Sequence, residues 1–274
     1  MKNTEIASPA TQVCWELAQQ TRADDVLIVG VGTPLAAAAA LLARAILHPS
    51  LTILFGTAVA PRNFNLAASM TDSSRVSRAA VGNYSQVEVL DLVSRGGVTL
   101  QFVSPVEVDR SGNLNASRIR QTDGSWRQFP GSLALGDTSV LVRRLVAYRV
   151  GHHRRFLPER VSFVSGASAL QEKTTSSPRG LGTVLAVTEM ATVSLGANPR
   201  LINYDHDLAA SKNGIGFSVD EGQAVQRMAA PPEVIAALAK LDPLGVRDLE
   251  DKNCRAAVLS QLSRGSESKL DNGE

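Results

Sequence analysis

The chain has 274 residues, 44% of them hydrophobic, which is enough for one large α/β domain or two small ones. Its 28 basic and 26 acidic residues nearly balance. The basic residues are scattered rather than gathered along one face, which argues against nucleic acid or another polyanion as a partner.

The sequence also indicates the compartment. The N-terminus lacks the apolar segment of a signal peptide, and the longest apolar run, residues 34–47, is too short to span a bilayer and contains Arg44. The only cysteines are Cys14 and Cys254, for which we expect free thiols rather than a disulfide. These features predict a cytoplasmic protein.

Residues 24–57 predict a strand–turn–helix–strand unit. Its parts are a strand at 26–29, a turn at Gly30 and Gly32, a helix from Pro34 to residue 47, and a strand at 51–55 that runs into Gly56 and Thr57. Continuous apolar strands of this kind favour a parallel sheet covered on both faces. The unit places backbone N–H groups and a helix N-terminus at the carboxyl edge of the sheet, where α/β proteins bind anionic or thioester ligands.

The rest of the chain predicts further helices and strands in alternation. We expect helices at 9–20, 83–95, 205–213 and 231–241, and strands at 98–103, 139–150, 161–164, 183–188, 191–195, 200–203 and 217–219. Residues 116–137 are polar and glycine-rich and predict a long loop, 165–177 predict a mobile segment, and 263–274 predict a disordered tail. The prediction is one α/β domain over 1–262, with an open, mostly parallel sheet and helices on both faces.

Short motifs occur in an order that resembles the β (B) subunits of class I CoA-transferases, the group that includes glutaconate CoA-transferase. They are VGVGTP at 29–34, LTILF at 51–55, EVDRSGNLN at 107–115, HHRRF at 152–156, RGLGTVLAVTEMATVSL at 179–195, GIGF at 214–217 and DPLGVRD at 242–248. Each is weak alone, but the collinear set is fairly specific. The resemblance implies a CoA-transferase-like α/β fold, an α-type partner subunit with the active site at the interface, and an acyl-CoA thioester as substrate, with no bound cofactor and no metal.

The resemblance makes one position decisive. In catalytically complete members a glutamate follows the strand equivalent to 51–55, attacks the thioester and becomes an enzyme-bound CoA thioester. Gly56 stands at that position here, and Thr57 beside it is a poor substitute without an adjacent base. Relatives without the glutamate act as decarboxylases or hydrolases. Decarboxylation of a vinylogous carboxylate needs no nucleophile, only donors that hold the thioester carbonyl while an enolate forms.

Other candidate residues follow from the same resemblance. Gly30, Gly32 and Thr33 would contact substrate or CoA, and Arg62 would hold a substrate carboxylate through its forked guanidinium. The loop that begins at Ser104 matches the oxyanion-pocket loop, although Pro105 removes an N–H donor there.

Three further features have a functional and a plainer interpretation. Glu107 faces either the site or solvent, whereas Asp109 is favoured as a turn-former. Gly131 and Gly136 belong either to a second CoA-contacting loop or to an ordinary surface loop. Residues 152–155 favour a charged interface or exposed turn over a metal site.

The leading hypothesis is thus a β subunit of a class I CoA-transferase-like heteromer that acts on an acyl-CoA with a second carboxylate, as a decarboxylase of glutaconyl-CoA type or through another activity that needs no ping-pong transfer. The alternatives are a true CoA-transferase or thioester hydrolase with its nucleophile elsewhere, a non-catalytic structural subunit, or a lone small-ligand binder related to sugar-phosphate isomerases. The last lacks the lysine and acidic residues expected of an isomerase.

Overall fold

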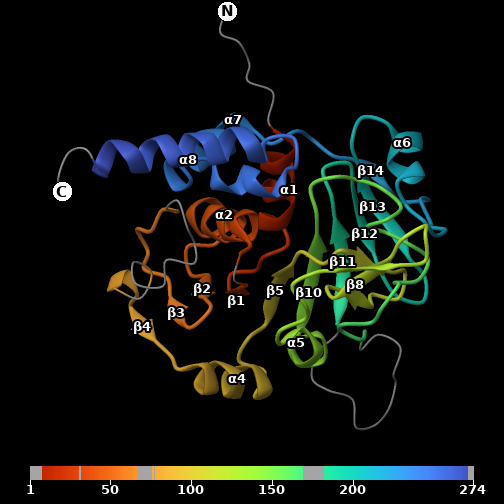
Figure 1. The fold of residues 1–274 in the computed structure, drawn as a ribbon, viewed down its shortest axis with the longest axis horizontal. Coiled ribbons are helices and arrows are strands. Elements are labelled where there is room, and N and C mark those ends of the chain that lie inside the picture. The colour runs from red at the N-terminus through yellow and green to blue at the C-terminus, as the bar shows by residue number, and fades with distance from the viewer. Residues whose placement is uncertain (1–7, 31, 67–75, 77, 169–181, 271–274) are drawn as a thin grey trace, which may run out of the picture.

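A computed structural model describes residues 8–30, 32–66, 76, 78–168 and 182–270. Its centre is a sheet of ten strands in the order β14-β13-β12-β11-β10-β5-β1-β2-β3-β4 (Figure 1). The strands are β1 (Val26–Val29), β2 (Thr52–Phe55), β3 (Ala58–Val59), β4 (Gly82–Asn83), β5 (Leu100–Val103), β10 (Arg144–Tyr148), β11 (Thr183–Val187), β12 (Ala191–Ser194), β13 (Arg200–Tyr204) and β14 (Val225–Gln226). The five neighbours from β11 to β2 are parallel, and most of the outer pairs are antiparallel. The predicted open, mostly parallel sheet is therefore confirmed.

Helices cover both faces of this sheet. On one face lie α1 (Pro9–Ala18), α2 (Pro34–Leu42) with a π-helical turn at Ala43–Leu47, α7 (Pro232–Leu241), a 3₁₀ helix η3 (Val246–Glu250) and α8 (Arg255–Leu270). On the other face lie α4 (Gln86–Ser94) and α5 (Leu135–Leu141), at the bottom of Figure 1. A short helix, α6 (Leu208–Asn213), follows β13. Alternate strand residues enter the two cores: Leu27 and Phe102 pack toward α2, and Leu145 and Ala147 pack toward the opposite face.

Local signals explain the helices that were predicted correctly. Ser8 caps α1 by accepting a hydrogen bond from the Thr11 N–H, and Pro9 occupies the first turn. Ser85 and Glu88 form a capping box at the start of α4. α8 continues to Leu270, so the chain is helical over much of the segment in which a disordered tail was expected.

Several predictions in the middle of the chain were wrong. The hairpin of β8 (Arg118–Arg120) with β9 (Trp126–Gln128) occupies part of the loop expected at 116–137, and α5 replaces the start of the expected strand at 139–150. Another small hairpin, β6 (Glu107–Val108) with β7 (Leu114–Asn115), precedes it. Residues 161–164 and 217–219 form no strand. The expected mobile segment lies mostly outside the described residues.

The motifs that carry the resemblance pack against one another. A Cβ at Gly214 would lie 2.0 Å from the His152 ring, so GIGF and HHRRF meet at a contact that only glycine permits. Gly112, at φ +85°, would place a Cβ 2.6 Å from the Thr183 carbonyl oxygen. In DPLGVRD, Asp242 accepts hydrogen bonds from the N–H groups of Val246 and Arg247. These motifs therefore fix the path of the backbone.

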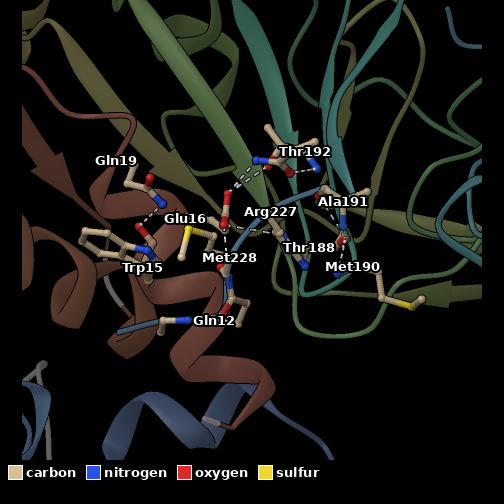
Figure 2. A network of polar contacts seen from close by, with 12 residues as sticks. Gln12, Trp15, Glu16, Gln19, Thr188, Met190, Ala191, Thr192, Arg227 and Met228 are labelled. Atoms are coloured by element: carbon tan, nitrogen blue, oxygen red, sulfur yellow. Dashed lines mark hydrogen bonds and ion pairs between the residues drawn. The ribbon is translucent and has the colours of Figure 1, made fainter. Parts of the chain in front are cut away.

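A buried polar network joins α1 to the far strands of the sheet (Figure 2). The Glu16 carboxylate accepts hydrogen bonds from Gln12 and from Asn203 of β13, at 3.1 and 2.9 Å. Arg227 lies 3.9 Å from the same carboxylate and donates to the Thr188 carbonyl oxygen at 3.0 Å. Segments far apart in sequence thus share one buried ion pair.

Within the described residues, no helix is long and apolar enough to cross a membrane. Cys14 is buried, Cys254 is half-buried, and both are free thiols.

Candidate functional site

The carboxyl ends of the parallel strands bring several predicted residues to one edge. Val29 is paired with Phe55 on one side and Phe102 on the other, so Gly30 and Gly56, which follow their strands, lie level on adjacent strands. Val103 is paired with Ala147, which places Ser104 level with Tyr148. Gly32 and Thr33 continue the loop from β1, and Thr57 continues the turn from β2.

Gly56 ends β2 in a left-handed conformation, with φ at +59°. Its N–H donates to the Val29 carbonyl oxygen at 3.3 Å. A Cβ built at this position would have no described atom within 4 Å, so the space beside Gly56 is open. Thr57 lies in the turn to β3, where its carbonyl oxygen accepts a hydrogen bond from the Tyr84 N–H at 2.8 Å.

The edge also contains a carboxylate that the sequence analysis did not consider. Glu250, at the end of η3, accepts hydrogen bonds at Oε1 from the Leu35 N–H at 2.9 Å and from the Tyr148 hydroxyl at 3.0 Å. The Ser104 side chain also interacts with this carboxylate. Burial raises the pKa of Glu250 to about 7, even though these three donors act to lower it. A carboxyl group that is half-protonated at neutral pH is suited to proton transfer.

Glu250 also binds one of the free N–H groups in the first turn of α2. The Thr33 hydroxyl donates to the Gly30 carbonyl oxygen at 2.8 Å and does not cap the helix. The Leu35 N–H is instead bound by Glu250, and the Ala36 N–H interacts with the Tyr148 hydroxyl. The N–H groups of Leu35 and Ala36, which the sequence pattern predicted to be available to an anionic ligand, therefore have partners within the chain.

Glu107 is held away from solvent. Its carboxylate accepts hydrogen bonds from the Asn115 side-chain amide and from both the N–H and the hydroxyl of Ser162, each at 2.7 Å. This arrangement ties the β6–β7 hairpin to the segment after β10. Asp109 accepts hydrogen bonds from the N–H groups of Ser111 and Asn113 at 3.0 Å, which confirms its role in a turn.

Arg62 is not brought to this edge. It follows β3, which runs antiparallel to β2 and returns toward the opposite edge of the sheet. There it lines a cavity of about 210 Å³ with Arg44, whose guanidinium donates to the carbonyl oxygens of Ala60 and Pro61. Burial, and secondarily the charge of Arg62, lowers the pKa of Arg44.

Gly131 and Gly136 belong to the end of the segment that leads into α5 and to its first turn. Gly131 has φ at +103° and open surroundings, and its N–H donates to the Ala116 carbonyl oxygen. Gly136 is in the first turn of α5, on the face of the sheet opposite α2 (Figure 1). The structure does not join them to the edge that carries Gly30 and Gly56.

The ring of His152, the first residue of the histidine pair, has polar partners on both nitrogens. The His152 ring contacts the Thr188 hydroxyl at 2.9 Å and the Ser211 carbonyl oxygen at 2.5 Å, and burial lowers its pKa. Among the described residues, no cluster of three or more histidine, cysteine or acidic side chains could hold a metal ion.

Solved structures with this architecture are numerous. A variant of the decarboxylase AibA/AibB is 25% identical, with a TM-score of 0.76 over 89% of this chain and 99% of that one. Glutaconate coenzyme A-transferase from Acidaminococcus fermentans is 18% identical, with a TM-score of 0.74 over 87% and 97% of the two chains. IpdAB from Rhodococcus jostii RHA1 is 20% identical, with a TM-score of 0.74 over 90% and 99%.

No protein-family model and no curated protein sequence matches the chain. The three structural neighbours are members of the class I CoA-transferase family, so the resemblance expected from the sequence motifs is confirmed. The comparisons place the chain with CoA-transferase-like enzymes.

Proposed function

We propose that this chain, which has the class I CoA-transferase fold, is the β-type subunit of a heteromeric decarboxylase that acts on an acyl-CoA with a second, vinylogous carboxylate. The α-type partner would complete the site at the carboxyl edge of the sheet. Similarity in fold both to a decarboxylase and to a CoA-transferase supports either reaction, so the choice between them depends on the site.

The open space at Gly56 is the observation that carries the proposal. A transferase of this family needs a carboxylate there, both as nucleophile and as leaving group in successive steps. Gly56 supplies no side chain, and no described atom fills the place of one. A substrate carboxylate could occupy this space without meeting another negative charge, and its loss as CO2 requires no covalent intermediate.

The remaining requirement is stabilisation of the electron pair that CO2 leaves behind. In a glutaconyl-CoA ester this pair delocalises into the thioester carbonyl, so hydrogen-bond donors near that oxygen lower the barrier. We assign this role to the partner subunit and to backbone N–H groups of the turns after β1 and β2, at the edge where Ser104 is exposed. Pro105, which has no N–H, cannot contribute.

The test uses the co-purified complex of this chain with its partner subunit. Incubated with glutaconyl-CoA, it should yield crotonyl-CoA and CO2, followed by mass spectrometry. Gly56→Glu should reduce CO2 release by at least about tenfold, because a carboxylate would occupy the space proposed for the substrate carboxylate. Gly56→Ala is the matched control: it carries the same left-handed backbone strain but adds no charge, so it should retain more activity.

Two outcomes would contradict the proposal. Exchange of CoA between acids without release of CO2 would show a transferase whose nucleophile lies elsewhere. Release of free CoA without CO2 would show a thioester hydrolase.

A further inference from the structure

We propose that Ser104 and Glu250 form a proton relay, in which Ser104 protonates the carbon framework of the substrate after CO2 has left and Glu250 restores the Ser104 proton. This inference rests on the proposed function and adds the source of the proton that decarboxylation consumes.

The two side chains lie at the same edge of the sheet. Ser104 directly follows β5, is exposed and is level with Tyr148 of β10, whereas the half-buried Glu250 is hydrogen-bonded to Tyr148 and to the first turn of α2. The Glu250 Oε1 atom already accepts hydrogen bonds from the Leu35 N–H and the Tyr148 hydroxyl. The proton of the neutral acid therefore belongs on Oε2, and the Ser104 side chain interacts with the same carboxyl group.

The surroundings of Glu250 keep it available as an acid. Within the part of the chain that the structure describes, no lysine, arginine or histidine nitrogen lies within 4.0 Å of it. The titratable groups that face it are Cys14 of α1, Tyr148 of β10, Arg149 after β10 and Arg255 of α8. Arg255 is too far away for an ion pair, and the Cys14 and Tyr148 side chains are neutral because burial raises the pKa of both.

The step balances as a simple proton transfer. The bond from the carboxylate carbon to the γ-carbon breaks, CO2 leaves, and the electron pair enters the thioester as a dienolate. The dienolate γ-carbon then takes the proton of the Ser104 hydroxyl, while Ser104 takes the Glu250 proton. Glu250 is left as a carboxylate, and solvent reprotonates it through Ser104 before the next turnover.

The first experiment is the pH profile of glutaconyl-CoA decarboxylation by the complex. In the wild type, kcat should fall as pH rises through about 7, because Glu250 loses its proton. Glu250→Gln should lose this fall and be at least about tenfold slower below it. Tyr148→Phe removes a donor that lowers the pKa of Glu250, so the fall should move to higher pH. Glu189→Gln is the matched control, since that carboxylate also accepts backbone N–H bonds, at 2.8 and 2.9 Å, and its variant should keep the wild-type profile.

The second experiment measures the proton step without decarboxylation. The complex is incubated with crotonyl-CoA in D2O, and deuterium at the γ-carbon is followed by mass spectrometry. Ser104→Ala, a change at an exposed position, and Glu250→Gln should each slow this exchange at least about tenfold. Exchange in both variants at the wild-type rate, in a complex that releases CO2, would overturn the relay alone. Exchange that needs both residues in a complex that releases no CO2 would support the relay and overturn the decarboxylase. The absence of both reactions in the wild type would overturn both.

Discussion

At the scale of single residues, Glu250 combines two tasks that usually fall to different groups. It binds a free N–H at the start of α2, which stabilises the helix, and partial burial raises its pKa to about 7. A surface cap such as Ser85 on α4 does only the first. Desolvation destabilises the charged form of Glu250 more than its hydrogen bonds stabilise it. The stability of the fold and the proton affinity of Glu250 are therefore linked.

This linkage predicts a pH-dependent stability. Because the folded-state pKa of Glu250 is raised from 4.5 to about 7, its stabilising contribution is fully present below about pH 4.5 and is lost as pH rises through 7. Relative to Glu250→Gln, the wild type should lose about 3 kcal/mol of unfolding free energy between pH 4.5 and pH 8. Urea unfolding of both proteins at several pH values measures this, and a pH-independent difference would show that the carboxyl group does not titrate in this range.

At the scale of elements, a buried clasp joins three parallel strands at the edge opposite the site. Asp25, just before β1, accepts hydrogen bonds from Arg144 of β10 at 2.5 Å and from the Thr99 hydroxyl before β5 at 2.7 Å. The side chains of Asp25 and Arg144 are 4% and 11% exposed. The clasp fixes the register of the strands whose other ends carry Gly30, Ser104 and Tyr148.

Breaking the clasp should be costly because it leaves a buried charge unpaired. Arg144→Met should lower the unfolding free energy by about 3 kcal/mol. Arg95→Met is the comparison, since its ion pair with Asp91 is exposed to solvent and should contribute far less to the unfolding free energy. Equal losses in urea unfolding of the two variants would contradict this view of the clasp.

The elements differ in how far sequence could predict them. The strands at 26–29 and 51–55 and the helix from Pro34 are encoded by local apolar runs and were predicted closely. The β8–β9 hairpin was missed because its strands are polar and mostly exposed, and no apolar alternation marks them. It is held instead by Arg118, whose guanidinium lies 4.7 Å from the Trp126 ring centre and 4.5 Å from the Phe163 ring centre. No local sequence pattern predicts this contact.

The site shows the same limit. Gly30, Gly56 and Ser104 could be predicted because each directly follows a strand of the parallel sheet, where such sheets place their sites. Arg62 was placed with them because it is near Gly56 in sequence, but the return of β3 carries it away. Glu250 was missed because its partner Leu35 lies 215 residues earlier. The only signal nearby is DPLGVRD, whose turn ends two residues before Glu250.

At the scale of the whole molecule, the Glu16 network connects the first helix with the last strands of the sheet (Figure 2). The side chains of Glu16 and Arg227 are each only 3% exposed, and the Nε and Nη2 atoms of Arg227 have no hydrogen-bond partner among the described residues. Burial lowers the pKa of Arg227, and the charge of Glu16 is the main opposing effect. The pair therefore stabilises the fold only when both members are present.

A double-mutant cycle tests this dependence. Glu16→Gln should cost about 3 kcal/mol of unfolding free energy, because Arg227 is then buried without its counter-charge. The double variant Glu16→Gln with Arg227→Met should cost at least about 1 kcal/mol less than the sum of the single changes. Additive losses in urea unfolding would mean that the two side chains stabilise the protein independently.

The cap on α2 also determines when the protein can finish folding on the ribosome. The β1–α2–β2 unit is synthesised first, but the carboxylate that binds the Leu35 N–H is contributed by the segment after α7. Until residue 250 has left the exit tunnel, the first turn of α2 can bind only water at that N–H. The edge of the sheet on which the proposed chemistry depends is therefore completed last, although its strands and glycines emerge first.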